Sequence, residues 1–297
     1  MNYLILSDKR AGHLNQSIAF AKHSQANYDI IHVAFTSKFA KILSYFFDFM
    51  RLYTNTLFKL DKPVNRSYDA IISAGSNTYY AAKTLAKTHG FKSITMMLPK
   101  GYRYDFDTIF AQAHDNPPSR NNIIALPANF SFTEPKRYFT PSKKAVGIII
   151  GGDNSVLKMH TQTLKLQLDF IVKHFHNYDI ALTTSPRTSH AIEELTQSYA
   201  FAYKVIFSQN PINPIGDFLH HCELVFITMD STSMISEAIS YGSSFIEVLP
   251  LTDTHDSKFY TMSQSLEKEG YLHIFNNTVA LNNRKINFET YAKKAFE

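Results

Sequence analysis

The stretch VFITMDSTSMISEAISYGSSFIEVLP, residues 225–250, passes from an apolar run through a polar turn into a helical pattern, and then returns to an apolar run. This order is typical of a βαβ unit, in which a helix connects two parallel strands. The turn gathers one carboxylate and four hydroxyls, from Asp230, Ser231, Thr232, Ser233 and Ser236. The stretch therefore predicts a parallel sheet with a strongly polar strand-to-helix junction.

The same alternation runs along the whole chain and favours an α/β fold. In the first half we expect strands at residues 3–6, 30–34, 70–73, 94–97, 108–111 and 123–126, and helices at 16–22 and 79–88. In the second half we expect strands at residues 145–152, 180–183, 204–207, 224–228 and 245–248, and helices at 161–175, 190–199, 215–221 and 233–241.

Between the halves, residues 129–144 contain two prolines and four lysines or arginines without clear periodicity, which indicates a linker. We therefore predict a Rossmann-like domain over residues 1–140 and a second over residues 141–286. A C-terminal helix within residues 287–297 is expected to cross back onto the first domain. Two such domains imply a cleft between them, where ligands usually bind.

The composition, with 44% hydrophobic and 19% charged residues, describes a globular protein with an ample core. A net charge of +5 suits an anionic ligand or an anionic membrane surface, and is too small to argue for nucleic acid. Cys222 is the only cysteine, so an intramolecular disulfide is excluded. No stretch reaches the roughly 20 apolar residues of a membrane span, and we find no signal-peptide pattern. We expect a cytoplasmic protein.

Three junctions of the second half combine the residue types that bind phosphate. In GGDNS, residues 151–155, Gly151 and Gly152 allow the backbone to approach a phosphate, and Asp153 and Asn154 follow them. The alternative is an ordinary strand-to-helix turn, because glycine pairs are common.

The second junction is TTSPRTSH, residues 183–190. Arg187, flanked by Ser185 and Thr188, is suited to hold a phosphate or carboxylate with two hydrogen bonds. The alternative is a solvated arginine beside a helix cap.

The third junction is the stretch quoted first. A helix cap needs a single hydroxyl or carboxylate, so capping accounts for only one of the five groups there. We predict that Ser231, Thr232 and Ser233 present hydroxyls and backbone N–H groups to a diphosphate at the start of the helix, and that Glu237 binds the ribose diol. Asp230 is assigned to the same nucleotide site.

In the first half, SDKRAGHLNQS (residues 7–17) follows the first strand and places Asp8, Arg10, Gly12, His13, Asn15 and Gln16 at a strand end. His13 is a candidate general base, with Asp8 as the other candidate catalytic group. The alternative is a surface histidine without a catalytic role. Ser76 and Asn77, in SAGSNTYY, occupy a second junction of this kind and indicate an acceptor site.

The segment from Lys38 to Lys62 is crowded with aromatic and aliphatic residues and carries five cations against two aspartates. This composition is typical of a helix that lies on an anionic membrane surface. The alternatives are a core helix pair or a protein-binding patch.

Other site classes find no support. The chain has no HExxH, paired cysteines or EF-hand pattern, so we expect no metal. It also lacks GxGxxG, Gx4GK[ST] and GxSxG, which argues against a dehydrogenase, a P-loop ATPase and an esterase. We expect no cofactor.

These motifs resemble those of the ELM1-like family, which comprises bacterial proteins and the plant mitochondrial fission proteins. The family pattern D-G-R-A-G-x-x-N-Q is matched by DKRAGHLNQ, with Lys9 at the usual glycine position. A strand ends in Gly151 and Gly152, and S-x-R-T-P is matched with Ser189 in place of proline. The most specific element, T-x-D-S-x-S-M-x-x-E-A, is matched by Thr228, Asp230, Ser231, Ser233, Met234, Glu237 and Ala238.

The resemblance implies a GT-B-like fold, with two Rossmann-like domains whose parallel sheets face each other across a cleft. It implies that the first domain binds the acceptor, through Arg10, Gly12, Asn15, Gln16, Ser76 and Asn77. The second would bind a nucleotide sugar through Gly151, Gly152, Asp153, Asn154, Ser185, Arg187, Thr188, Asp230, Ser231, Thr232, Ser233, Met234 and Glu237.

Together these features favour a metal-independent glycosyltransferase that uses a nucleotide sugar to modify a lipid-linked or lipopolysaccharide acceptor. It would act in the cell envelope as a peripheral protein on the inner face of the cytoplasmic membrane. Three alternatives stay open: a sugar-nucleotide epimerase, a Kdo-type glycoside hydrolase, and a membrane-associated scaffold without catalysis.

Overall fold

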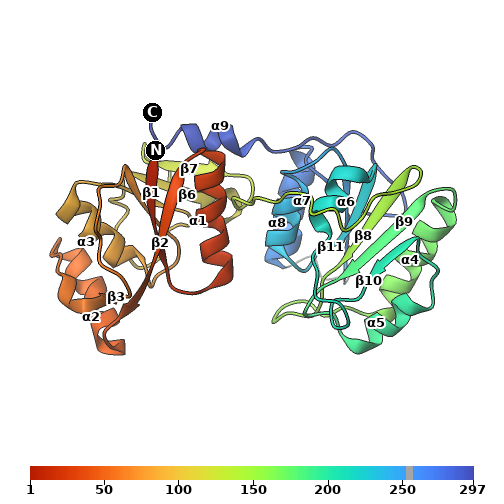
Figure 1. Ribbon diagram of the computed structural model, residues 1–297, viewed down its shortest axis with the longest axis horizontal. Coiled ribbons are helices and arrows are strands. Elements are labelled where there is room, and N and C mark those ends of the chain that lie inside the picture. The colour runs from red at the N-terminus through yellow and green to blue at the C-terminus, as the bar shows by residue number, and fades with distance from the viewer. Residues whose placement is uncertain (252–256) are drawn as a thin grey trace. The chain divides into compact units, whose positions relative to one another are not determined.

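The computed structural model describes residues 1–251 and 257–297. It divides into two compact units, Met1–Phe132 with Asn287–Glu297, and Thr133–Ile286 (Figure 1). Each unit is an α/β structure built on one mostly parallel sheet, so the predicted fold class is confirmed.

The first unit holds a seven-stranded sheet in the order β3-β2-β1-β4-β5-β6-β7. All neighbouring strands are parallel except β2 and β3. The strands are β1 (Asn2–Ser7), β2 (Asn27–Phe35), β3 (Phe58–Leu60), β4 (Ala70–Ser73), β5 (Lys92–Thr95), β6 (Thr108–Gln112) and β7 (Ile123–Leu126). The helices are α1 (Ala11–His23), α2 (Lys38–Phe49), α3 (Tyr79–His89) and α9 (Phe288–Lys293), with short 3-10 turns at Asn55–Leu57 and Ala113–Asp115.

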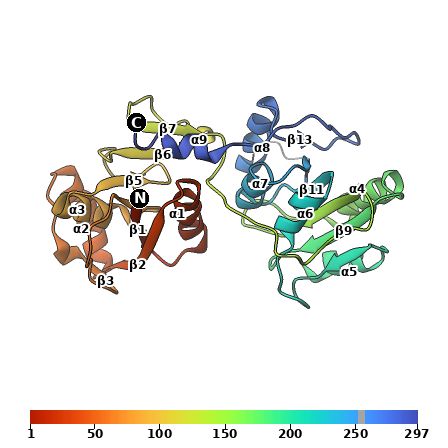
Figure 2. The ribbon, with the colours of Figure 1, turned by 45° about the horizontal axis from the view of Figure 1, so that its top comes forward.

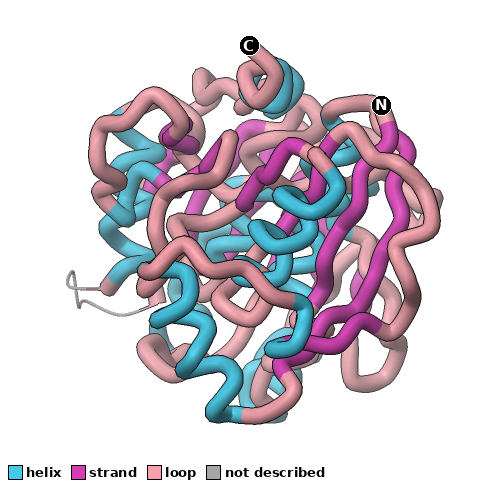
Figure 3. Tube along the Cα trace, turned by 90° about the vertical axis from the view of Figure 1, so that its left-hand side faces the viewer, coloured by secondary structure: helices cyan, strands magenta, loops and turns pink. Residues whose placement is uncertain are grey.

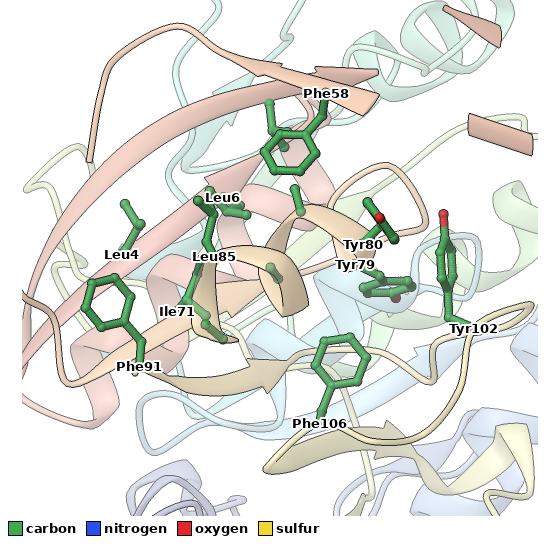
Figure 4. Packing of buried hydrophobic residues seen from close by; sticks show 14 of the residues in the cluster. Leu4, Leu6, Phe58, Ile71, Tyr79, Tyr80, Leu85, Phe91, Tyr102 and Phe106 are labelled. Atoms are coloured by element: carbon green, nitrogen blue, oxygen red, sulfur yellow. The ribbon is translucent and has the colours of Figure 1, made fainter. Parts of the chain in front are cut away.

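Alternate residues of β1 face opposite sides of this sheet, as the pleat of a strand requires. Leu4 and Leu6 pack with α3 (Figure 4), while Tyr3 stacks on Phe20 of α1 at 5.6 Å. Helices α2 and α3 therefore cover one face and α1 covers the other, an arrangement visible in Figures 1 and 2. In Figure 3 the strands of this unit appear in magenta with cyan helices against them.

The second unit holds a six-stranded, fully parallel sheet in the order β10-β9-β8-β11-β12-β13. The strands are β8 (Ala145–Ile150), β9 (Asp179–Thr184), β10 (Tyr203–Val205), β11 (Leu224–Thr228), β12 (Phe245–Leu249) and β13 (His273–Ile274). The helices are α4 (Thr161–His174), α5 (His190–Gln197), α6 (Ile215–His221), α7 (Thr232–Ala238) and α8 (Lys258–Lys268). Side chains of α4 and α5 share a buried cluster with β8, whereas α6 packs its Phe218 against Gly147.

Both sheets contain the same reversal of strand order. In the second unit β9 lies on one side of β8 and β11 on the other, and in the first unit β2 and β4 flank β1 in the same way. Ligands of open α/β sheets bind beside such a switch point, at the carboxyl ends of the strands. The loops after β1 and β4, and those after β8 and β11, are therefore the places to examine for a site.

The structure corrects several expected boundaries. Helix α1 begins at Ala11, five residues before the expected start, and α7 ends at Ala238. Residues 38–62 are not one helix, because α2 ends at Phe49 and Arg51 takes a left-handed backbone conformation with φ of 59°. Strands β3 and β13 and helix α8 were not expected, and β3 and β13 are only three and two residues long.

The expected division after residue 140 also differs from the structure. Residues 133–140 belong with the second unit, because the Asp217 carboxylate accepts the backbone N–H groups of Lys136, Arg137 and Tyr138 at 3.0, 2.8 and 3.1 Å. The C-terminal residues Asn287–Glu297 belong with the first unit.

Within the part of the chain that the structure describes, no helix combines the length and the apolar character needed to cross a bilayer.

Candidate functional site

Three loops of the second unit meet at the carboxylate of Asp230, which follows β11 and has no exposed side-chain surface. Its Oδ1 accepts a hydrogen bond from the Thr228 hydroxyl at 2.6 Å. Its Oδ2 accepts one from the backbone N–H of Gly152 at 3.0 Å and one from Arg187 Nη2 at 2.7 Å. The structure thus brings together the three junctions that the sequence analysis singled out.

Glycine is required at both positions of the Gly151–Gly152 pair by close packing. A Cβ built on Gly151 would lie 2.1 Å from Asp230 Oδ1, and one on Gly152 would lie 2.0 Å from the carbonyl oxygen of Arg187. Glycine at both positions therefore lets the neighbouring loops pack closely, and this need for glycine does not depend on a bound phosphate. Phosphate binding by these glycines stays a prediction.

Arg187 fastens its own loop to the loop after β8. Its Nη1 donates to the carbonyl oxygens of Gly152 and Asp153 at 3.5 and 3.3 Å, in addition to the ion pair with Asp230. Its side chain is nevertheless 41% exposed, so part of the guanidinium is accessible to an anion in solution. Ser185 and Thr188 support this loop: Ser185 N donates to Thr188 Oγ1, which donates to the Gly151 carbonyl oxygen.

Side chains of the loop after β8 shape that loop. Asp153 Oδ1 accepts the backbone N–H of Met159 at 2.8 Å. Asn154 Oδ1 accepts the N–H groups of Val156 and Leu157, each at 2.8 Å, while Asn154 Nδ2 donates to the Asp230 carbonyl oxygen at 2.9 Å.

The hydroxyls at the start of α7 divide into two groups. Ser231 is the helix cap and accepts from Met234 N at 3.3 Å, and Ser236 donates to the Thr232 carbonyl oxygen at 2.7 Å. The hydroxyls of Thr232 and Ser233 make no hydrogen bond within residues 1–251 and 257–297, and Ser233 is exposed. The five polar groups of this turn are therefore not equivalent, and the Asp230 carboxylate already accepts three hydrogen bonds from the protein.

Glu237 lies one turn further along α7. Burial raises the pKa of its carboxyl group, while a hydrogen bond with Thr133 and the charge of Lys136 lower it in part. The carboxyl group therefore lies beside the segment that leads into the second unit. Its predicted contact with a ribose is not tested by this geometry.

In the first unit, Asp8 and His13 form a hydrogen-bonded pair at the switch point. His13 Nδ1 lies 3.1 and 3.2 Å from the two carboxylate oxygens of Asp8, whose side chain is 3% exposed. Because the Asp8 carboxylate accepts a hydrogen bond from Nδ1–H, the neutral imidazole keeps its lone pair on Nε2. The His13 side chain is 19% exposed, and its role as a general base stays a prediction.

Glycine at position 75 makes room for His13. A Cβ built on Gly75 would lie 2.3 Å from His13 Cε1, and the residue has φ of 85°. Gly12 has no such role, since it lies inside α1 and a Cβ there would meet nothing within 4 Å. Lys9 has φ of 66°, which explains why glycine suits this position in the resembling family.

Asn77 and Lys41 extend the hydrogen-bonded pair Asp8–His13 as far as Ser76. Lys41 is a residue of this network that the sequence analysis missed. Asn77 Nδ2 donates to Asp8 Oδ2 at 3.3 Å. Lys41 Nζ donates to Asn77 Oδ1 at 2.7 Å and to Ser76 Oγ at 3.2 Å. Lys41 lies on α2, far from the other residues in sequence, and no spacing rule connects it with them.

Arg10 joins this network at its edge: its backbone N–H donates to Asp8 Oδ1 at 3.2 Å, and its mostly exposed side chain forms an ion pair, with Nε 3.7 Å from Asp8 Oδ2. The remaining first-unit candidates do not join it. Asn15 is exposed, and Gln16 has a buried Oε1 with no hydrogen-bond partner among the described residues. Within the described ranges, no three His, Cys, Asp or Glu side chains are placed to hold a metal ion.

Comparison with known proteins agrees with this architecture. A protein of Rickettsia prowazekii named uncharacterized protein RP120 is 23% identical over 328 residues, which span 95% of this chain and 92% of that protein. Among solved structures, a protein assigned as a UDP-N-acetylglucosamine 2-epimerase from Listeria monocytogenes has a TM-score of 0.54 at 14% identity, covering 99% of this chain and 87% of the other. MurG from Acinetobacter baumannii has a TM-score of 0.48 at 12% identity, covering 93% and 85%.

The likeness to the Listeria protein shows that the two units have the GT-B-like fold expected from the sequence. The family model described as mitochondrial fission ELM1 matches residues 11–294, nearly the whole chain. The chain therefore belongs to the mitochondrial fission ELM1 family.

Proposed function

We propose that this protein is a nucleotide-sugar enzyme, and that its reaction is transfer of the sugar to a lipid-linked or lipopolysaccharide acceptor. The observation that carries the proposal is the convergence of the loops after β8, β9 and β11 on Asp230, at the switch point of a Rossmann-type sheet. Ligands bind at that place in such sheets. The fold shared with a protein assigned as a UDP-N-acetylglucosamine 2-epimerase supports a nucleotide sugar as the ligand.

In this proposal the second unit binds the donor. The exposed part of Arg187 contacts the phosphates and offsets the negative charge that develops on the leaving group. The hydroxyls of Thr232 and Ser233, with Met234 and the loop from Gly151 to Asn154, complete the phosphate site. Glu237 binds the ribose. Asp230, Ser185 and Thr188 act indirectly, by holding the loops in place.

The first unit supplies the base. His13 Nε2 takes the proton of the acceptor hydroxyl as the oxygen attacks the sugar, and Asp8 stabilises the resulting imidazolium. Asn77 and Lys41 hold Asp8 from the other side. Ser76, Arg10, Asn15 and Gln16 are assigned to acceptor binding.

A lipid acceptor is favoured by the exposed face of α2. Phe39 and Phe49 are 70% and 71% exposed, and Ile42 and Phe46 lie between them on the same helix face. Exposed large apolar side chains at this spacing, near several lysines, suit a helix that lies in a membrane surface. We propose peripheral contact with the anionic inner face of the cytoplasmic membrane through residues 38–62.

Epimerisation of the nucleotide sugar is the second candidate, favoured by the fold shared with the Listeria protein. The two reactions separate in one experiment, in which the protein is incubated with UDP-N-acetylglucosamine and the sugar products are followed by NMR. An epimerase inverts a carbon of the sugar without any acceptor. A transferase leaves every sugar carbon except the anomeric one in its original configuration, and releases UDP only when glycolipid is added. No product under either condition would contradict both reactions for this donor.

A further inference from the structure

Two adjoining cavities of the first unit lie beside the C-terminal end of α2, apart from the loops after β1 and β4. One has a volume of about 480 Å³ and the other about 540 Å³. They share Arg51, Arg103 and Asp105 as lining residues. The first adds Lys83, Lys87 and Asp107, and the second adds Arg120.

The cations of these cavities fall into two groups. Lys83 is almost fully buried and pairs with Asp48 at 2.7 Å and Asp105 at 2.5 Å, and Arg103 pairs with Asp105 at 2.5 Å. Asp107 accepts hydrogen bonds from the backbone and hydroxyl of Ser93. Lys83 and Arg103 are thus paired within the protein, whereas the Asp107 carboxylate is hydrogen-bonded but has no cationic partner within 4.0 Å among the described residues.

The second group, Arg51, Lys87 and Arg120, is exposed and has no carboxylate within 4.0 Å among the described residues. Lys87 lies over the ring of Tyr53 at 5.0 Å and Arg120 over that of Tyr104 at 5.3 Å. These three cations outnumber the one unpaired carboxylate of the lining, Asp107, so the two cavities present a net positive charge, which favours an anionic ligand.

Arg51 is the cation common to both cavities, and its backbone is held in an unusual state. Its N–H donates to the Asp48 carbonyl oxygen at 3.1 Å, and Leu52 N closes the turn on Phe47 O at 2.8 Å. Its φ of 59° is a left-handed conformation that residues other than glycine rarely adopt. The turn at the end of α2 therefore fixes the backbone position from which the Arg51 side chain extends.

The surroundings of Arg51 indicate which anion would bind. Its chain neighbours Met50 and Leu52 are half-exposed, and Phe46 and Phe49 extend the apolar surface along α2. Apolar surface contributes nothing to the binding of a free phosphate, whereas a phospholipid presents a phosphate beside acyl chains. Arginine is also suited to phosphate, because its planar guanidinium can form two parallel hydrogen bonds.

We propose that these cavities bind the headgroup phosphate of an anionic membrane lipid, with Arg51, Lys87 and Arg120 as the cationic ligands. The proposal rests on the membrane contact proposed above for residues 38–62. It adds a headgroup site to a surface that otherwise binds by its apolar side chains and overall charge.

The test is co-sedimentation of the full chain with vesicles of phosphatidylcholine alone and of phosphatidylcholine mixed with phosphatidylglycerol. Arg51→Gln is compared with Lys59→Gln, which removes the same charge from an exposed position of the same segment. We expect Arg51→Gln to weaken binding to the phosphatidylglycerol vesicles by about tenfold or more, as loss of a charged hydrogen bond implies. Lys59→Gln should weaken it by about fivefold at most, as loss of one cation near an anionic surface implies.

Equal losses in the two variants would overturn the headgroup site and leave only general attraction to the membrane. Stabilisation of the wild type by glycerol 3-phosphate in solution, with no effect of Arg51→Gln on vesicle binding, would overturn the lipid as ligand. Absence of wild-type binding to any vesicle, or full binding by a Phe46→Ser, Phe49→Ser double variant, would contradict the membrane contact itself. Nucleotide binding by Arg51→Gln should equal that of the wild type, which separates this inference from the donor site.

Discussion

Individual residues of the two switch points show why identical residue types have different roles. Gly12 and Gly152 both lie in motifs that resemble those of the family, yet only Gly152 lacks space for a side chain. Lys9 illustrates the reverse, since a non-glycine residue occupies a left-handed conformation. Sequence spacing placed all three residues near a strand end, but the need for glycine depends on contacts with a loop that is distant in the chain.

We predict opposite effects for alanine at the two glycines. Gly152→Ala should lower the free energy of unfolding of the second unit by roughly 2 kcal/mol or more, because the Cβ would collide with the Arg187 backbone. Gly12→Ala should leave the free energy unchanged or raise it by up to about 1 kcal/mol, since the position is helical and open. Urea unfolding followed by circular dichroism measures both. A neutral Gly152→Ala would show that the loop after β9 does not pack as described.

Among the elements, α7 is the helix on which the proposed donor site depends. The carbonyl oxygen of its last residue accepts a hydrogen bond from a buried lysine. Lys285 Nζ donates to the carbonyl oxygen of Ala238, the final residue of α7, at 2.6 Å. Burial lowers the pKa of Lys285 from 10.5 to about 7. The charged form is thus stabilised by the helix end but destabilised by loss of water.

This shift predicts a pH dependence with a definite sign. Between pH 7 and the ordinary pKa of lysine, the unfolded chain binds more protons at Lys285 than the folded chain does, so stability rises with pH. The contribution is at most about 1.4 kcal/mol per pH unit. It should be measured from pH 7 to 8. Above that range the unfolded Cys222 begins to lose its proton, whereas burial raises the pKa of the folded thiol to about 12, so Cys222 would lower the stability as pH rises.

The measurement is the urea unfolding free energy of the wild type and of Lys285→Met at several pH values in that range. The difference between the two should change with pH, with the wild type gaining stability relative to the variant as pH rises. Parallel curves would contradict a buried lysine with a lowered pKa.

Several elements were predictable from the sequence because their signal is local. The six expected strands of the first half are all present, since each is an apolar run between turn residues. The end of helix α2 was the exception. The apolar pattern continues to residue 62, but the helix ends at Phe49, where the backbone turns at Arg51. The short strands β3 and β13 carry too few residues for a periodic pattern and are defined by pairing with β2 and β12.

At the scale of the whole molecule, the two units repeat one scheme, in which polar loops follow the strands on either side of a switch point. This recurrence made the neighbourhood of each site predictable, because a parallel sheet brings the ends of adjacent strands together. The internal hydrogen bonding could not be predicted. No motif indicated that Thr228, Gly152 and Arg187 enclose the Asp230 carboxylate, and Lys41 enters the first network from a helix with no motif.

The central claim is that the loops around Asp230 form a nucleotide site, and calorimetric titration tests it most directly. Wild-type protein is titrated with UDP, GDP, CMP, ADP and dTDP beside two variants: Ser233→Phe, which places a large side chain on the exposed start of α7, and Ser243→Phe, which makes the same change at an exposed serine beyond the helix's other end. We predict that one nucleotide binds the wild type and Ser243→Phe with equal affinity, and that Ser233→Phe reduces the affinity at least tenfold. Binding of no nucleotide to the wild type, or equal binding by all three proteins, would contradict the claim.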